Sequence, residues 1–439
     1  MDVSQSALGL SLKALNRFAG LELVDRLGLR EPAVRALRGA SKQGFRTAGA
    51  AGRTFTAAQR LGRPARPSAR PSSDQFDLTP TDEQQMMVEA IGEFAQEQMR
   101  PVAQAADDAG APPSEILEQT TELGIVSMSI PEELGGLVGE RSAVTSVLIA
   151  EALARGDMGL ALACLAPTGV STALTLWGDE DQQARYLAEF AGEKPPAAAL
   201  ALLEPRPLFD AFRLETRARP ADGGGYVLEG VKSLVPRAAD AELFMIGAEL
   251  EGMGPALFLV ESKTDGVSIE PEPAMGVRAA ATGRLHLDNV ELGDDALLGG
   301  GEAQAYSECV ALARLGWCAV VVGTARAVLD LVIPYVNERE AFGEPISNRQ
   351  AVAFTVSDIG IELEGMRLAT LHAASRADQG KGFAREAALA HRLCSHKGMK
   401  IGSDGVQLLG GHGYVKEYPV ERWYRDLRAA GLMEGALLV

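Results

Sequence analysis

The stretch QLLGGHGYVKEYPVERWYRDLR, residues 407–428, is the most specific local pattern in this chain of 439 residues. Its first half contains three glycines, Gly410, Gly411 and Gly413. Glycine lets the backbone turn tightly and approach a ligand closely. A pair of glycines alone would indicate only the end of a helix. Tyr414 beside them and the downstream pair Arg425 and Asp426 make a plain helix end an insufficient explanation, so we interpret this stretch as part of a ligand site.

Long helical patterns precede this stretch. Residues 303–336, 346–378 and 383–410 are rich in Ala and Leu, and their apolar positions recur with helical spacing. Helices of this length usually pack side by side. We therefore predict a C-terminal helical bundle, with a four-helix arrangement, over residues 301–439.

The pattern changes between about residue 195 and residue 298. Short apolar or alternating runs follow one another there: AAALALLE, YVLEGVKSLV, ELFMIGAEL, ALFLVES, VSIEPE and GRLHLDNVEL. Gly, Pro and Asp separate them at short intervals, which is typical of antiparallel strands. We predict a central antiparallel β-barrel or sandwich over residues 195–300.

The part before it, residues 78–194, is again helical in pattern. Thr81 is a candidate N-cap, because acidic residues and a long amphipathic run follow it. Further helical patterns cover residues 113–123, 142–154, 158–176 and 180–192. The predicted fold class is therefore α+β and multidomain: a helical domain, a β domain and a helical bundle, preceded by residues 1–77.

Residues 1–77 form a basic arm on an acidic protein. The net charge is −17, whereas residues 1–72 contain 13 Lys and Arg against 4 Asp and Glu, which is +9 and leaves −26 for the remainder. Parts of this arm have helical periodicity, and residues 60–74 are a Pro-, Arg- and Ser-rich linker. Such charge suits anionic lipid, nucleic acid or an acidic protein surface. We predict peripheral membrane contact through residues 1–72 or docking on the protein itself, and no nucleic-acid partner.

The cysteines and apolar runs indicate the compartment. Four cysteines lie far apart without a CxxC pair, Cys164, Cys309, Cys318 and Cys394. They predict free, buried thiols in a reducing compartment. We see no metal site, no run near 18 apolar residues and no secretory signal. The expected localisation is cytoplasmic, peripheral to the membrane if the arm binds lipid; the Arg-rich arm leaves a mitochondrial transit peptide open.

The order helical–β–helical, together with residues 407–428, resembles the acyl-CoA dehydrogenase family. Four N-terminal pieces match in order: LTPTDEQQ, LGIVSMSIPEELGG, EALARGDMGLA and LWGDEDQQARYL. The resemblance covers residues 78–439. It implies FAD as cofactor, an acyl-CoA substrate, an electron-transfer flavoprotein as electron acceptor, and a homo-oligomer, a dimer or homotetramer.

The resemblance also implies cofactor-binding residues. The stretch NEREAFGEPISNRQAVAF places Arg339, Phe342 and Gln350 at the ADP half of the flavin, often across a subunit interface. A guanidinium makes charge-assisted, often bidentate bonds to pyrophosphate. Gln407, Gly410 and Gly411 would lie at the adenine end, Leu203 and Leu234 would lie at the flavin positions of the β domain, and Arg425 would contact the substrate.

The stretch LMEG, residues 432–435, resembles the family's Tyr-Glu-Gly-Thr site and implies that Glu434 is the catalytic base. It falls eight residues after Asp426, as the family spacing requires. Removal of an α-proton from a thioester needs a base whose pKa lies near the working pH. Some relatives place this base before an arginine on an earlier helix. That position is Ala313 here, and Ala cannot take a proton.

Several positions depart from the family pattern. Leu203 and Phe209 stand where hydroxyl residues usually bind the flavin, and Leu234 stands where a Trp is usual. Pro236 replaces a further hydroxyl residue and has no N–H. Ala436 replaces a Thr, and the chain ends five residues after Glu434, so either this ending is genuine or a tail is missing. A chain end that later structure does not tie down tends to be mobile, which would position a base poorly.

From this resemblance we expect oxidation of an acyl-CoA to the trans-2-enoyl-CoA, with flavin N5 taking the β-hydride. Two alternatives remain open. One is a weakly active or non-catalytic subunit of a hetero-oligomeric dehydrogenase, favoured by the lost flavin-binding side chains. The other is a membrane-surface adaptor on the same scaffold, favoured by the basic arm.

Overall fold

The computed structural model describes residues 80–435. The predicted arm, its linker and its membrane contact fall outside the described residues, as does Ala436.

The first helical region begins at the predicted N-cap. Helix α4 (Asp82–Phe94) starts after Thr81, whose hydroxyl accepts a hydrogen bond from the Gln84 N–H, while Gln84 accepts one from the Thr81 N–H. This reciprocal capping box confirms the prediction for Thr81. A π-helical turn (Ala95–Met99) continues into α5 (Arg100–Ala109). The other helices are α6 (Ser114–Glu122), α7 (Ala143–Ala154), α8 (Met158–Trp177), α9 (Glu180–Gln182) and α10 (Ala188–Phe190).

The β region forms one eight-stranded sheet with the order β6-β7-β3-β2-β4-β5-β8 and with β1 beside β4. Its strands are β1 (Ala198–Ala201), β2 (Arg217–Pro220), β3 (Tyr226–Val235), β4 (Leu243–Leu250), β5 (Gly254–Glu261), β6 (Val267–Pro271), β7 (Gly283–Leu292) and β8 (Leu297–Leu298). Most pairs are antiparallel, as predicted, but β1 and β2 each run parallel to β4. The sheet is therefore mixed.

Strand β2 was not predicted. Its sequence is Arg-Ala-Arg-Pro, and only Ala218 is buried. Charged residues and a proline hide the alternating apolar pattern that marks a strand. Pairing with the long strand β3 supplies the backbone partners that this short strand needs.

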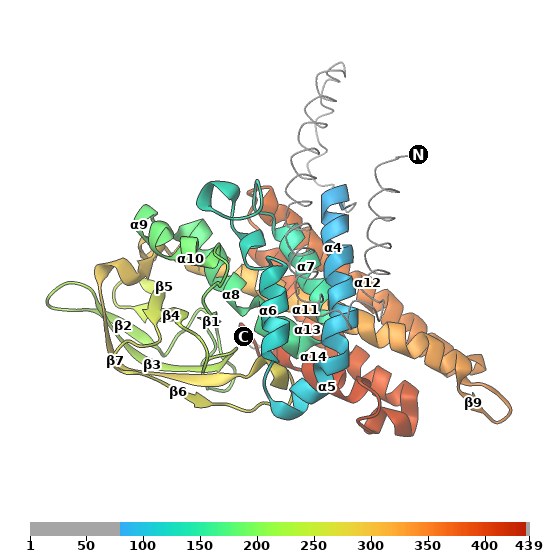
Figure 1. Ribbon diagram of the computed structural model, residues 1–439. Helices are drawn as coiled ribbons and strands as arrows, with labels where there is room; N and C mark the ends of the chain where they lie inside the picture. The colour runs from blue at the N-terminus through green and yellow to red at the C-terminus, as the bar shows by residue number, and fades with distance from the viewer. Residues whose placement is uncertain (1–79, 436–439) are drawn as a thin grey trace, which may run out of the picture. The chain divides into compact units, whose positions relative to one another are not determined.

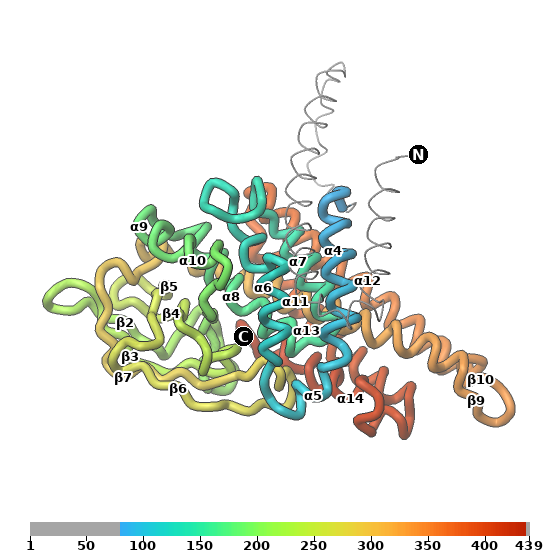
Figure 2. Tube along the Cα trace, in the orientation of Figure 1, coloured from blue at the N-terminus to red at the C-terminus, as the bar shows by residue number. Residues whose placement is uncertain are grey.

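The C-terminal region consists of long helices, α11 (Ala303–Glu338), α12 (Gln350–Asp378) and α13 (Ala384–Leu409), followed by the short α14 (Val420–Leu427). Helix α11 packs against α13, α12 and also α7 (Figures 1 and 2). Between α11 and α12 lies a small hairpin of β9 (Glu340–Ala341) and β10 (Glu344–Pro345), which projects from the helices. The predicted helical bundle is confirmed, and α12 begins four residues later than its pattern suggested.

Two apolar cores hold these parts. One joins both helical regions, with Met99, Leu153, Val320 and Leu363 among its buried members. The other lies within the sheet. The helical regions therefore share one core although the sheet separates them in sequence. All four cysteines are buried and unpaired, as predicted.

Two described helices, α8 and α11, are long and apolar enough to cross a membrane by length and composition. No apolar segment of this length was predicted from the sequence. In the most apolar window of each, 56% and 67% of the residues are buried inside the protein. A helix that packs on several neighbours becomes apolar on most of its surface, so this composition also suits a core helix.

Candidate active site

Glu434 lies on the short segment that follows α14. Its backbone has a φ of 56°, and Gly435 has a φ of 112°. A left-handed conformation is costly for a residue other than glycine and persists only where its surroundings hold it. Arg314 on α11 supplies one such contact, because its Nε donates to the Glu434 carbonyl oxygen at 3.0 Å. A Cβ on residue 435 would lie 2.9 Å from the Arg314 guanidinium, so the glycine leaves room for it.

The Glu434 side chain is only 7% exposed. Its Oε1 accepts a hydrogen bond from the Trp317 Nε1–H at 3.3 Å. Its Oε2 is buried and has no hydrogen-bond partner among the described residues. Arg314 and Trp317, both on α11, therefore hold the backbone and the side chain of Glu434 in place.

Burial raises the pKa of the Glu434 carboxyl above its usual value, and Trp317, Arg314 and Lys232 oppose this rise. Burial disfavours the charged carboxylate, while a hydrogen-bond donor and nearby cations favour it. A carboxyl with a raised pKa is a better base near neutral pH than an exposed glutamate. This is the electrostatic environment expected of a carboxylate that receives a proton.

Glu434 faces a largely apolar cavity of about 230 Å³. Helices α7, α8 and α11 supply most of its wall, with small residues such as Ala166, Gly169, Ala313 and Gly316. Small side chains leave space between packed helices, where an apolar chain can lie. The cavity can therefore hold an acyl group beside a buried carboxylate.

A second cavity of about 460 Å³ adjoins the first. Four residues line both cavities, Leu162, Pro236, Trp317 and Met433. The second cavity lies between the end of β3, the loop after β6, and the helices α13 and α14, and Leu234 is part of its wall. Leu203 lines neither cavity and is buried in the helical core.

The wall of this second cavity suits the flat apolar face of a flavin ring system, but it offers few hydrogen-bond donors for the polar edge of the ring. Its wall is mainly apolar, which suits a flat aromatic group. The Thr282 hydroxyl and the Leu234 N–H, two donors at this wall, already bond to Glu272. Pro236 offers no N–H. The other polar side chains of this wall are those of Ser395, His396, Arg425 and Arg428.

The residues expected at the ADP half of the flavin lie elsewhere. Arg339, Phe342 and Gln350 are exposed at the β9–β10 hairpin and the start of α12, and the Phe342 side chain is 97% exposed. Gln407, Gly410 and Gly411 are exposed at the end of α13. None of these six lines the two cavities near Glu434.

Tyr335, near the end of α11, links the segment before the β9–β10 hairpin to the glycine turn after α13. Its hydroxyl donates to the Leu409 carbonyl oxygen at 3.1 Å and lies 2.8 Å from His412 Nδ1. The His412 ring stacks on Tyr418. No role was predicted for His412, but its contact with Tyr335 ties the glycine turn to the end of α11. The two sets of predicted cofactor residues therefore belong to neighbouring surfaces.

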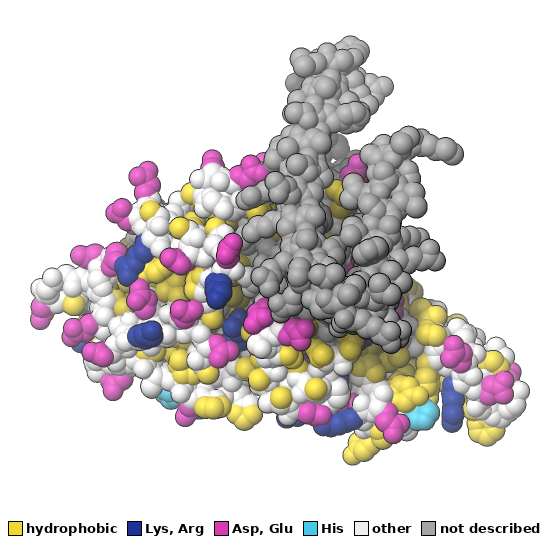
Figure 3. All heavy atoms as spheres, in the orientation of Figure 1, with side chains coloured by type: hydrophobic (Ala, Val, Ile, Leu, Met, Phe, Trp, Pro, Cys, Tyr) yellow, Lys and Arg dark blue, Asp and Glu magenta, His cyan; other side chains and the backbone are white. Residues whose placement is uncertain are grey.

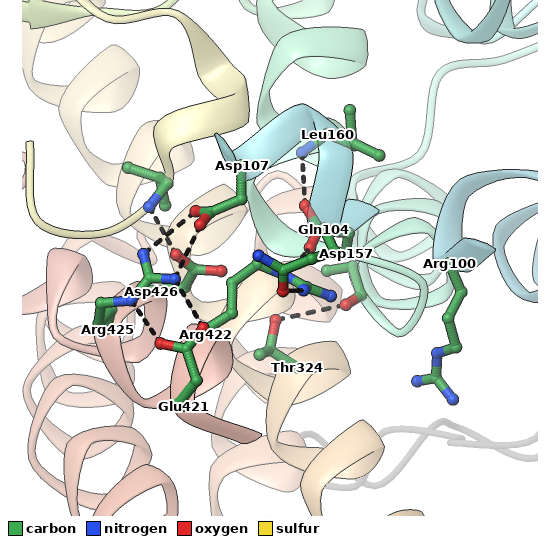
Figure 4. Close-up of polar contacts among 12 residues, drawn as sticks. Arg100, Gln104, Asp107, Asp157, Leu160, Thr324, Glu421, Arg422, Arg425 and Asp426 are labelled. Carbon is green, nitrogen blue, oxygen red and sulfur yellow. Dashed lines mark hydrogen bonds and ion pairs between the residues drawn. The ribbon is translucent and has the colours of Figure 1, made fainter. Parts of the chain in front are cut away.

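The charged turn on α14 joins distant elements (Figure 4). Arg425 forms ion pairs with Asp107 at 2.8 Å and Glu421 at 2.9 Å, and Arg422 pairs with Asp157 at 2.9 Å. Asp426 accepts a hydrogen bond from the Val277 N–H at 2.6 Å. Arg425 was predicted to contact the substrate. It lines the second cavity, but its guanidinium already has two carboxylate partners in this chain.

The structure contains a buried ion pair between Lys232 and Glu204 that was not predicted from the sequence. Lys232 Nζ lies 2.9 Å from Glu204 Oε1 and 3.1 Å from the Leu202 carbonyl oxygen. Burial lowers the Lys232 pKa to about 8, although Glu204 and Glu434 oppose this shift. The available signal was a lysine inside the apolar run YVLEGVKSLV. A lysine in such a run requires a buried partner.

The chain matches three domain models. Residues 81–194 match the N-terminal domain of acyl-CoA dehydrogenases, residues 199–290 the middle domain, and residues 300–437 the C-terminal domain. These matches cover the helical, β and helical regions in the order described above.

Individual proteins agree with this result. The short/branched chain specific acyl-CoA dehydrogenase of Rattus norvegicus is 33% identical over 363 residues, covering 81% of this chain and 83% of that protein. The butyryl-CoA dehydrogenase structure from Megasphaera elsdenii has a TM-score of 0.77 and 27% identity, covering 83% and 97%. A chain in a structure of the electron transferring flavoprotein of Acidaminococcus fermentans has a TM-score of 0.76 and 29% identity, covering 83% and 97%. This chain therefore belongs to the acyl-CoA dehydrogenase family of FAD-dependent oxidoreductases.

Proposed function

We propose that this protein dehydrogenates an acyl-CoA thioester between its α and β carbons and releases the trans-2-enoyl-CoA. The observation that carries the proposal is the Glu434 carboxylate. It is buried at an apolar cavity, and its Oε2 has no partner among residues 80–435. A buried carboxylate oxygen without a partner is costly in a protein that has no use for it.

Glu434 takes the α-proton on Oε2, and the Trp317 indole holds Oε1 so that the other oxygen faces the substrate. Bound FAD supplies the acceptor for the hydride that leaves the β carbon. The shared wall of the two cavities supports this arrangement, because a thioester lying there would have Glu434 on one side and the ring system on the other. The electrons then pass to an electron-transfer flavoprotein.

The first cavity favours a short acyl group. Its volume of about 230 Å³ is small, and ligand pockets commonly measure about 300–1,000 Å³. A short or branched chain fits this space better than a long fatty acyl chain. The rat relative is likewise named for short and branched chains.

We also propose that the protein works as a homo-oligomer. Phe354, Ile361 and Leu368 are spaced by seven residues on α12 and are 59%, 69% and 44% exposed. This spacing puts them on one face of the helix. Hydrophobic side chains are visible at the surface beside the helices that lead to the β9–β10 hairpin (Figure 3). A second copy would cover this face and would bring Arg339 and Gln350 to a partner's cofactor.

A second candidate function is a weakly active or non-catalytic subunit that acts with a related chain. The second cavity favours this alternative. Pro236 has no N–H, and the Leu234 N–H and the Thr282 hydroxyl already donate to Glu272, so few donors are left for the polar edge of a flavin. The purified chain separates the two. A yellow protein with a flavin spectrum supports the enzyme, and a colourless protein that cannot be reconstituted supports the partner subunit. The membrane-surface adaptor rests on the basic arm, which lies outside the described residues, and stays a prediction. The cytoplasmic localisation also stays a prediction.

The proposal is tested by anaerobic bleaching of the flavin with a panel of acyl-CoA thioesters. Glu434→Gln should slow bleaching by about 10²–10⁴-fold, the usual contribution of a positioned base, without loss of FAD. Glu118→Gln is the matched control, because Glu118 is exposed on α6 and lines neither cavity. Near-normal bleaching in Glu434→Gln would remove this carboxylate from the reaction.

A further inference from the structure

The cavity beside Glu434 contains a second ionisable side chain. Arg141 comes from the loop before α7, whereas Glu434 comes from the opposite end of the described chain. These two residues are the only charged side chains among the described residues that line this cavity. Its other polar groups are the Trp317 indole, the Cys309 thiol and four hydroxyls, and the rest of the wall is apolar. The cavity therefore presents one buried carboxylate and one cation to whatever occupies it.

Arg141 is half-buried and has no hydrogen-bond acceptor or ion-pair partner among residues 80–435. Its Nε is buried without a hydrogen-bond acceptor, and no ion pair is formed by its guanidinium within residues 80–435. Burial lowers the Arg141 pKa, and Asp378 is the group that opposes this shift. A guanidinium has five N–H donors, so a buried arginine normally bonds to acceptors or pairs with a carboxylate.

Asp378 does not fill this role, because other donors occupy it. Its carboxylate accepts hydrogen bonds from the Ser142 hydroxyl at 2.7 Å, the Ala143 N–H at 2.5 Å and the Val144 N–H at 3.1 Å. Asp378 thus caps the start of α7 and attracts Arg141 only through space. The donors of Arg141 remain available to the cavity.

We propose that Arg141 binds a carboxylate at the far end of the acyl group, and that the ligand of this cavity is a CoA thioester of a dicarboxylic acid. The thioester end lies at Glu434, the apolar walls contact the methylene chain, and the guanidinium receives the terminal carboxylate. An arginine can bind a carboxylate through two parallel hydrogen bonds, which fixes its position and orientation. This inference rests on the proposed dehydrogenase function and specifies its substrate class.

The test compares pairs of thioesters that differ only in the terminal group. Straight-chain acyl-CoAs from butyryl to octanoyl are matched with acyl-CoAs of equal length that carry a terminal carboxylate. Binding is measured by calorimetry on the FAD-loaded protein, and kcat/KM is measured separately with an artificial electron acceptor. At the length that spans the cavity, we expect the carboxylated member to be favoured by on the order of 10- to 100-fold.

Arg141→Met should abolish this preference while turnover of the uncarboxylated thioesters is kept. It should also raise Tm by about 2–4 °C, because a half-buried cation whose Nε has no described acceptor is replaced by an apolar side chain of similar length. Arg141→Lys keeps the charge but not the two-pronged geometry, so it should retain part of the preference. Arg385→Met is the matched control, since this side chain is 82% exposed on α13.

The outcomes separate this proposal from the proposed function. Turnover of uncarboxylated thioesters without any preference in the wild type overturns the Arg141 subsite and leaves the dehydrogenase intact. A preference in binding without turnover supports the subsite and contradicts the dehydrogenase. A preference that survives in Arg141→Met assigns the carboxylate to another residue, and failure of the wild type to bind any thioester overturns both proposals.

Discussion

The two oxygens of Glu434 have different surroundings, and this difference assigns their roles. Oε1 accepts the Trp317 indole hydrogen bond, while Oε2 is buried without a described partner. A hydrogen bond to the charged form of a carboxyl lowers its pKa, whereas burial raises it. Trp317 therefore does more than fill space between the two cavities. It orients the carboxylate and limits how far its pKa rises.

Trp317→Phe should raise the pKa of Glu434, because the donor that favours the carboxylate is removed. The deprotonated base then appears only at higher pH, so the acidic limb of the kcat/KM profile should move upward by about one pH unit. A pH profile with the preferred thioester checks this. Trp423→Phe serves as control, since the Trp423 Nε1 has no described hydrogen-bond partner. If the acidic limb does not move in Trp317→Phe, the indole does not control the pKa of Glu434.

At the scale of elements, the walls of the acyl cavity depend on close contact between helices. Gly323 on α11 lies against α7, where an added Cβ would be 2.2 Å from the Glu151 carbonyl oxygen. The Glu151 side chain pairs with Arg367 of α12 at 2.9 Å. Three helices thus meet at one point. Because α7 and α11 also line the cavity, their separation sets its width.

Gly323→Ala should destabilise the protein by at least about 1–3 kcal/mol, because the methyl group forces the two helices apart. The opposite sign is expected for Gly365→Ala in α12. A Cβ there meets nothing within 4 Å, and alanine favours a helix over glycine by up to about 1 kcal/mol. Denaturant unfolding of both variants measures the two changes. Equal stabilisation by both substitutions would contradict the close packing of α7 on α11.

At the scale of the whole molecule, the predicted cofactor residues lie in two separate places. Leu234 lies at the second cavity, whereas Arg339, Phe342 and Gln350 are exposed at the hairpin and the start of α12. Exposed apolar residues that recur on one helix face usually mark an interface. The homo-oligomer proposed above would explain both observations, because a partner copy would cover α12 and share the cofactor.

Ile361→Glu should weaken this assembly, because it places a charge in the middle of the apolar face. We expect a lower mass by light scattering and a lower FAD content in the same preparation. Met253→Glu is the control, since Met253 is 58% exposed at the turn between β4 and β5, away from α12. Retention of both mass and FAD in Ile361→Glu would exclude α12 as the shared interface.

The sequence by itself determined the order of the helical, β and helical regions, the family and the position of Glu434. These features are local: helical spacing marks α11 and α13, and the resemblance of LMEG and of its distance from Asp426 to the family pattern implies the base. Strand β2 was not predicted because its four residues lack an apolar alternation. Helices α8 and α11 were predicted as helices, but no apolar run long enough to cross a membrane was expected in them. The roles assigned to Arg425 and to the ADP-side residues stay predictions.

Only the tertiary structure decided what surrounds these residues. Trp317 and Glu434 are 117 residues apart, and Lys232 and Glu204 are 28 apart, so no local pattern pairs them. Nothing in the local sequence around Arg141 predicts that it lines the same cavity as Glu434. Burial, hydrogen-bond partners and pKa values follow from packing between distant segments, whereas periodicity and spacing report only on neighbours along the chain.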